Sequence, residues 1–326
     1  MHLARVALAS LMAAMLLATV GEAAPRTRHT VVHGWPDMPE GRVLGQAAGV
    51  AVDPMGEVVV FHRAKRTWRE PLKLDPIDAP TLAVFDAKSG RLVREWGAGL
   101  FALPHGLTID QAGNVWVTDV ALNQVMKFDP KGALLLTLGE RGVAGHDAAH
   151  FNRPTDVAVL ADGSFYVSDG YLNTRIMKFD AKGVFQFQWG SPGAGPGQFN
   201  VPHGLAVDRQ GRVYVADREN DRVQVFDATG RFLAQWKDRA IGRPYGLAML
   251  PGDRMAIADG GEQPDDGPDR SGVAIVDLKG HVLERFGRFG LYDGQFWGAH
   301  DIAADARGDI YVVDIDGQRV QKFTAR

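Results

Sequence analysis

The stretch Pro202-His203-Gly204-Leu205-Ala206-Val207 is one of six similar apolar segments that recur along this chain of 326 residues. The other copies lie at 48–53, 104–109, 154–159, 244–249 and 299–304. Successive copies begin about 40 to 60 residues apart, a period typical of proteins in which each repeat forms one small sheet. The repeat, more than any single motif, therefore indicates the fold.

Each repeat contains four strand-sized runs separated by turn residues. In the second repeat these runs are 107–109, 114–119, 124–129 and 134–138. Turns such as Asp110-Gln111-Ala112-Gly113 suit tight antiparallel connections, because glycine adopts positive φ without steric cost. Six such units predict an all-β fold, a six-bladed β-propeller in which every blade is a four-stranded antiparallel sheet.

The sixth repeat ends before its fourth strand, whereas the N-terminal region contains a spare strand-like run. The run His29–Trp35 resembles the fourth strands of other repeats, such as 93–97. We expect it to complete the last blade, since ring closure hides two sheet edges that would otherwise promote aggregation. The sequence thus predicts a single propeller domain over residues 24–326, with surface-loop insertions at 64–79 and 260–271.

Composition narrows the classes of function. The formal net charge is -3, hydrophobic residues make up 45% of the chain, and no block of Lys and Arg indicates nucleic-acid binding. The absence of cysteine excludes disulfides, thiolate metal ligands and a cysteine nucleophile. No serine nucleophile elbow, phosphate loop or dinucleotide fingerprint stands between a strand and a helix, so nucleotide chemistry is not indicated.

Residues 1–23 have the features of a secretory signal peptide. Arg5 supplies positive charge, Val6–Val20 is apolar, and Gly21 and Ala23 are small residues suited to a cut after Ala23. An uncleaved membrane anchor is the alternative, although the apolar run is short for a bilayer span. We expect a secreted or periplasmic monomer that does not contact the membrane after cleavage.

The residue before the central Gly or Asp of each repeated segment varies in an informative way. In chain order it is Ala48, His105, Thr155, His203, Tyr245 and His300. In a ring of six, the three histidines lie a third of a turn apart, and their imidazoles can converge on a metal ion with one position open for substrate. Zinc is favoured, although imidazole also binds iron, copper and nickel. The alternative is that each histidine lines the channel and bonds to water or backbone.

Two acidic positions also repeat. The residue after the histidine position is usually Gly but is Asp156 and Asp301 in two copies, where carboxylates and backbone carbonyls suit a hard cation such as calcium, or else cap local backbone groups. The residue that closes the second strand is His62 in the first copy and aspartate in the others, namely Asp119, Asp169, Asp217, Asp259 and Asp314. We expect these five carboxylates to bond backbone groups at the blade corners.

The residues that follow the corner positions differ between copies and include Arg63, Tyr171 and Arg218. In a propeller these loops share one mouth of the channel. Two arginines there suit binding of a substrate carboxylate. Tyr171 suits acid–base chemistry where a nearby cation favours the phenolate. Each arginine taken alone is also consistent with a surface salt bridge.

Several short motifs carry a more specific resemblance. They are Gly49–Pro54, Phe61-His62-Arg63, Leu103–Leu107, Trp116–Leu122, Arg153–Val159, Ser168–Tyr171, Val201-Pro202-His203, Ala216–Asn220 and His300-Asp301-Ile302. The repeats resemble NHL-type propellers, and these motifs resemble the catalytic domain of the peptidyl-α-hydroxyglycine α-amidating lyase family over nearly the whole chain after the signal peptide.

The resemblance implies a metal-dependent lyase that splits the N–C bond of a peptidyl-α-hydroxyglycine, or a similar carbinolamide, into an amide and glyoxylate. It implies two ions, a catalytic zinc and a structural calcium. The implied zinc ligands are His105, His203 and His300, and the implied calcium ligands are the carbonyls of Val50 and Leu107 and the carboxylate of Asp301. It also implies that Tyr171 is the base and that Arg63 and Arg218 line the site of a small-molecule or peptide substrate with a terminal carboxylate.

One departure from the family pattern lies close to the site. The family has a methionine two residues before the last histidine, whereas this chain has Gly298 beside Trp297. We expect this change to open or reshape the substrate pocket. Two other functions remain as alternatives: a calcium-dependent propeller hydrolase or lactonase, in which channel carboxylates would dominate over histidines, and a non-catalytic NHL propeller that binds ligands with its rim.

Overall fold

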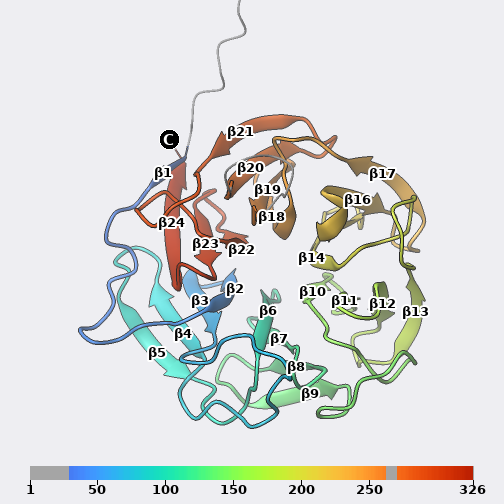
Figure 1. Ribbon diagram of the computed structural model, residues 1–326, viewed down its shortest axis with the longest axis horizontal. Helices are drawn as coiled ribbons and strands as arrows, with labels where there is room; N and C mark the ends of the chain where they lie inside the picture. The colour runs from blue at the N-terminus through green and yellow to red at the C-terminus, as the bar shows by residue number, and fades with distance from the viewer. Residues whose placement is uncertain (1–28, 262–269, 326) are drawn as a thin grey trace, which may run out of the picture.

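A computed structural model describes residues 29–261 and 270–325 and shows six four-stranded sheets arranged as a ring around a central channel (Figure 1). All strand pairings within the sheets are antiparallel. The six-bladed propeller predicted from the repeats is therefore confirmed, and within the described residues the one helix is the 3-10 turn η1 (Arg218–Asn220).

The strands of each blade run outward from the channel in chain order, except that the outermost strand of blade 6 is the N-terminal strand. Blade 1 is β2 (Ala47–Val52), β3 (Glu57–His62), β4 (Leu82–Asp86) and β5 (Leu92–Trp96), and blade 2 is β6 (Pro104–Ile109), β7 (Val115–Asp119), β8 (Gln124–Phe128) and β9 (Leu134–Leu138). Blade 3 is β10 (Asp156–Val159), β11 (Phe165–Asp169), β12 (Arg175–Phe179) and β13 (Phe185–Trp189), and blade 4 is β14 (Pro202–Val207), β15 (Val213–Asp217), β16 (Arg222–Phe226) and β17 (Phe232–Trp236). Blade 5 is β18 (Pro244–Leu250), β19 (Arg254–Asp259), β20 (Gly272–Asp277) and β21 (Val282–Phe286), and blade 6 is β22 (Ala299–Ala304), β23 (Ile310–Asp314), β24 (Arg319–Ala325) and β1 (His29–Val31).

The ring is closed by the N-terminal strand, as predicted. Strand β1 pairs with β24, with His29 opposite Ala325 and Val31 opposite Phe323, and Figure 1 shows the two strands side by side. The strand is shorter than the predicted run, because the chain turns at Gly34, whose φ is 73°. Trp35 leaves the sheet and packs in the core of blades 1 and 6.

The blade corners confirm the expected role of the repeated aspartates. Both carboxylate oxygens of Asp119 accept N–H groups from the preceding loop, including that of Leu103 at 2.9 Å. In blade 4, Asp217 accepts the N–H of Asn200 and forms a buried ion pair with Arg222 at 2.7 Å. Because breaking a buried ion pair is costly, these hydrogen-bonded carboxylates hold the corner loops in place relative to the sheets.

The predicted signal peptide lies outside the described residues, as do residues 24–28 of the predicted domain. In the part of the chain that is described, no helix has the length and apolarity needed to span a bilayer.

Candidate metal centre and active site

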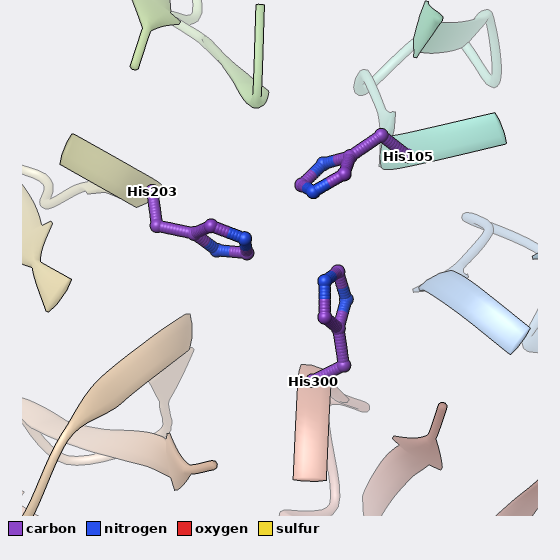
Figure 2. Close-up of side chains that lie close together, drawn as sticks. All are labelled: His105, His203 and His300. Carbon is purple, nitrogen blue, oxygen red and sulfur yellow. The ribbon is translucent and has the colours of Figure 1, made fainter. Parts of the chain in front are cut away.

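Three histidines from alternate blades meet at the channel axis. His105, His203 and His300 are each the second residue of the innermost strand of blades 2, 4 and 6. Their ring centroids are 4.8, 4.9 and 4.9 Å apart, and one nitrogen from each lies within 4.8 Å of the others. Figure 2 shows the three rings pointing toward one another from separate strands. The sequence predicted this convergence from repeat position alone.

A β-bulge aims each histidine at the axis. In β6 the register against β7 shifts between Pro104 and Leu107, so that one extra residue is inserted at the histidine position. The same irregularity occurs at the start of β14 and of β22. Bulges re-aim side chains next to sites, and here they turn the histidines out of the sheet and into the channel.

The backbone of the next blade holds each ring by its Nδ1 atom. Nδ1 of His105 lies 2.8 Å from the carbonyl oxygen of Thr155, and Nδ1 of His203 lies 3.0 Å from that of Tyr245. Nδ1 of His300 lies 2.7 Å from the carbonyl oxygen of Ala48. A carbonyl only accepts hydrogen bonds, so each Nδ1 carries the proton and each Nε2 lone pair is left for the channel.

Electrostatics keep the cluster neutral. Burial lowers the pKa of all three imidazoles, and it lowers that of His300 to about 3 with the nearby Arg63 charge as a second cause. Three neutral Nε2 donors with oriented Nδ1–H groups are the donor set that zinc prefers when one coordination position stays open. The residues present therefore fit a zinc ion.

Tyr171 reaches the cluster from the loop after β11. Its hydroxyl lies 3.0 Å from Nε2 of His105 and 3.4 Å from Nε2 of His203. Nη1 of Arg218 donates to the same hydroxyl at 3.5 Å. The structure thus brings two of the three predicted catalytic residues together with the histidines, so that a phenol oxygen lies beside both the imidazole nitrogens and a cation.

Arg218 is held by its neighbour in η1. Its Nε and Nη2 atoms donate to Oε1 of Glu219 at 2.9 and 2.8 Å, and Glu219 also bonds Arg243. The Nε/Nη2 edge of the guanidinium is therefore already occupied, and Nη1 is the group that faces Tyr171.

Arg63 stands at the same mouth but is anchored more deeply. Its side chain is 2% exposed, Nε donates to the carbonyl of Pro104 at 2.9 Å, and Nη1 donates to Gln46 at 3.0 Å. Burial lowers the pKa of Arg63 to about 10, so the side chain stays charged near neutral pH. Its guanidinium lies 5.7 Å from the ring of Trp68, which in turn packs against Tyr171.

A layer of carboxylates lies next to the histidines along the channel. Asp156 and Asp301 border the small cavity between the three histidines and also line a cavity of about 310 Å³ with Val50 and Leu107. Oδ2 of Asp301 accepts the N–H of Val50 at 2.9 Å. Burial raises the pKa of Asp301 to about 7, and burial together with the charge of Asp301 raises that of Asp156 well above its usual range. Two buried carboxylates that repel each other fit a divalent cation between them.

The structure adds neighbours that were not among the predicted site residues. Tyr245 borders the histidine cavity, Glu219 fixes Arg218, and Trp68 covers Tyr171 from the blade 1 insertion. Tyr245 had a sequence signal, because it occupies the histidine position of an odd-numbered repeat. Glu219 also had one, because it follows Arg218 in the variable loop after the corner aspartate of blade 4. Trp68 had none, since its contact with Tyr171 depends on how loops from different blades meet.

Gly298 leaves room near the third histidine. A Cβ atom added there would meet Oδ2 of Asp316 at 3.4 Å and Cγ2 of Ile315 at 3.6 Å, which are ordinary contacts. The adjacent Trp297 is 45% exposed and packs against Phe289. The backbone thus tolerates a larger residue at 298, and glycine leaves space where the family pattern places methionine.

Comparison with known proteins gives relatives that match this architecture. A family model described as NHL repeat matches residues 199–226 and 296–323, which lie in blades 4 and 6. A solved gluconolactonase from Xanthomonas campestris has a TM-score of 0.62 at 13% identity, with 87% of each chain covered, which shows a shared fold alone.

Two curated relatives are much closer in sequence. Peptidyl-glycine alpha-amidating monooxygenase B of Xenopus laevis is 39% identical over 300 residues, covering 86% of this chain and 34% of the relative, so the chain spans about a third of that protein's length. Peptidyl-alpha-hydroxyglycine alpha-amidating lyase 2 of Drosophila melanogaster is 34% identical over 306 residues, covering 87% of this chain and 72% of the relative. Because the Drosophila lyase is 34% identical over most of its own length and most of this chain, this protein belongs to the peptidyl-α-hydroxyglycine α-amidating lyase family.

Proposed function

We propose that the protein is a zinc-dependent lyase that cleaves the N–C bond of a peptidyl-α-hydroxyglycine, or a related small carbinolamide, to release an amide and glyoxylate. Family membership supports the lyase role. The observation that carries the proposal is the phenol oxygen of Tyr171, 3.0 Å from Nε2 of His105 at a cluster of three neutral histidines.

The reaction needs one proton moved and one bond broken. When bound by the three histidines, zinc supplies Lewis acidity toward the hydroxyl oxygen of the substrate. Tyr171, as the general base, takes the hydroxyl proton while the carbon–oxygen double bond forms and the C–N bond breaks. Tyr171 returns the same proton to the departing amide nitrogen, so that peptide amide and glyoxylate account for every atom of the substrate.

Arg218 and Arg63 orient the substrate through its carboxylate. Because Glu219 occupies the Nε edge of Arg218, the carboxylate accepts from the Nη1 end of the guanidinium. Arg63, with Nε committed to Pro104, offers its remaining terminal N–H groups. One contact from each of two fixed arginines aligns the scissile bond between the tyrosine and the metal site.

We further propose that a calcium ion is bound by the carboxylate of Asp301 and the carbonyls of Val50 and Leu107, with Asp156 adding a second carboxylate. Neutralising the two buried acids would stabilise the inner strands on which the histidines lie. Export of the protein, proposed from residues 1–23, suits calcium binding because extracellular calcium is abundant.

A direct test is metal analysis and turnover of the protein purified without residues 1–23. We expect one zinc per chain and release of glyoxylate from α-hydroxyhippurate. Tyr171→Phe should lower kcat by about 10²–10⁴-fold, the usual range for a lost acid–base group, while zinc content stays unchanged.

The alternatives predict other results. Turnover of a lactone with calcium alone would favour the hydrolase, and a folded, zinc-free protein without turnover would contradict the lyase. The control for folding is thermal unfolding of each variant, which should match the wild-type protein for Tyr171→Phe.

A further inference from the structure

Aromatic and cationic side chains alternate in a row across the mouth above the histidines. The ring of Trp68 lies 5.0 Å from that of Tyr171, and the guanidinium of Arg218 lies 5.3 Å from the ring of Tyr171. The same guanidinium lies 4.8 Å from the ring of Tyr245, and that of Arg243 lies 5.4 Å from the ring of Tyr245. Arg218 of blade 4 is thus bordered by phenol rings from blades 3 and 5.

Tyr245 is built into the site rather than placed on its surface. Its ring centroid lies 5.0 Å from that of His203 and 5.6 Å from that of His300, and its carbonyl accepts from Nδ1 of His203. Gly260 passes directly against the ring, since a Cβ atom at that position would lie 2.2 Å from a ring carbon. Glycine at 260 is therefore what allows the ring of Tyr245 to occupy this position.

Arg218 depends on these neighbours for its orientation. Glu219 fixes one edge of the guanidinium, but a single carboxylate leaves the plane free to tilt about that edge. Aromatic faces attract a guanidinium and favour stacked geometries, more strongly where water is excluded. The side chain of Arg218 is 13% exposed, so contacts with both rings act in a largely water-free environment.

We propose that Tyr245 is a positioning residue that acts through Arg218: its ring, together with that of Tyr171, holds the guanidinium so that Nη1 meets the carboxylate of the substrate. The inference rests on the proposed lyase function and deepens it by assigning part of the carboxylate recognition to a residue that performs no chemistry. Losing the ring should weaken substrate binding while leaving the chemical step and the metal intact.

The test compares Tyr245→Leu, which removes the aromatic face, with Tyr245→Phe, which keeps it. We expect Tyr245→Leu to raise KM for α-hydroxyhippurate about tenfold with kcat within about threefold of wild type, matching the energy of a buried cation–π contact. Tyr245→Phe should keep both constants within about threefold, and both variants should retain zinc. An unchanged KM in Tyr245→Leu, or a large fall of kcat in Tyr245→Phe, would overturn the positioning role.

A second variant and a binding measurement cover the remaining outcomes. Gly260→Ala displaces the ring without removing it and should raise KM in the same way as Tyr245→Leu, even where the latter folds poorly. Calorimetric binding of hippurate, which carries the carboxylate but lacks the hydroxyl, does not require turnover. Tenfold weaker hippurate binding in Tyr245→Leu supports the positioning role of Tyr245. If the protein then shows no turnover, only the proposed lyase function fails. If the wild-type protein does not bind hippurate, the positioning role is refuted.

Discussion

The even-numbered and odd-numbered blades contribute to the centre in different ways. Blades 2, 4 and 6 supply the side chains of His105, His203 and His300, whereas blades 3, 5 and 1 supply the backbone carbonyls that hold those side chains. In the odd blades the residue whose carbonyl is used is threonine, tyrosine or alanine. Because every residue type has a backbone carbonyl, accepting the bond from a histidine Nδ1 places no constraint on the side chain at these odd-blade positions. That side chain is free to take another role, as at Tyr245.

The largest expected effect comes from exchanging a side chain in an even blade. His203→Ala should abolish stoichiometric zinc and lower kcat/KM about 10³-fold or more, because a metal contributes several kcal/mol of transition-state stabilisation. Thr155→Ala alters the equivalent position of an odd blade but keeps its carbonyl. It should retain zinc and lose less than about tenfold in activity, as measured by metal analysis and glyoxylate release. Equal losses in the two variants would contradict the division between blades.

The two channel carboxylates come from one odd-numbered and one even-numbered blade, so they test whether both kinds of blade can contribute side chains to one ion site. Asp156 lies in blade 3 and Asp301 in blade 6, half a ring apart. Adding calcium to chelator-treated protein should stabilise it by about 2.7 kcal/mol at a concentration 100-fold above Kd. Asp301→Asn should remove this dependence in thermal unfolding, whereas magnesium should not substitute in the wild-type protein. Full calcium dependence in Asp301→Asn would show that the ion binds elsewhere.

The glycine after the histidine protects the contact between blades. A Cβ atom at Gly106 would lie 2.4 Å from the carbonyl oxygen of Thr155, the group that holds His105. Gly106→Ala should therefore cost about 2 kcal/mol of unfolding free energy, within the range for overpacking, and weaken zinc binding. Gly298→Ala, where the added atom meets only ordinary contacts, is the matched control and should change unfolding in urea by less than about 0.5 kcal/mol.

The smallest effect concerns blade 1, the odd blade whose corner residue is His62 rather than aspartate. Burial lowers the pKa of His62 to about 4, so below the unfolded value of about 6.5 the unfolded chain binds a proton that the folded chain does not. Stability is therefore lost as the pH falls, by about 1 kcal/mol between pH 7 and pH 5.5 from this group. In urea unfolding, His62→Gln should lose about 1 kcal/mol less unfolding free energy than the wild-type protein between pH 7 and pH 5.5. An identical pH dependence of stability in the two proteins would show that His62 is not the group responsible.

Much of the fold was predictable because repetition is visible in the chain. Six copies of one apolar segment predicted six blades, the missing fourth strand predicted closure by the N-terminal run, and the five aspartates predicted the corner bonds. The same repetition predicted that the three histidines would converge, since equivalent positions of alternate repeats are separated by a third of a turn in a closed ring of six.

The sequence by itself thus determined the number of blades, the closure of the ring and the residue types that gather at its axis. Tertiary structure alone decided how those residues are aimed: the bulges that turn the histidines inward, the carbonyls that fix their tautomer, the Glu219 contact that occupies one edge of Arg218, and the placement of Trp68 and Tyr245. The reason is physical. Repeat position follows from local periodicity along one chain, whereas orientation depends on atoms from different blades that come within a few ångströms of one another only after the ring has closed.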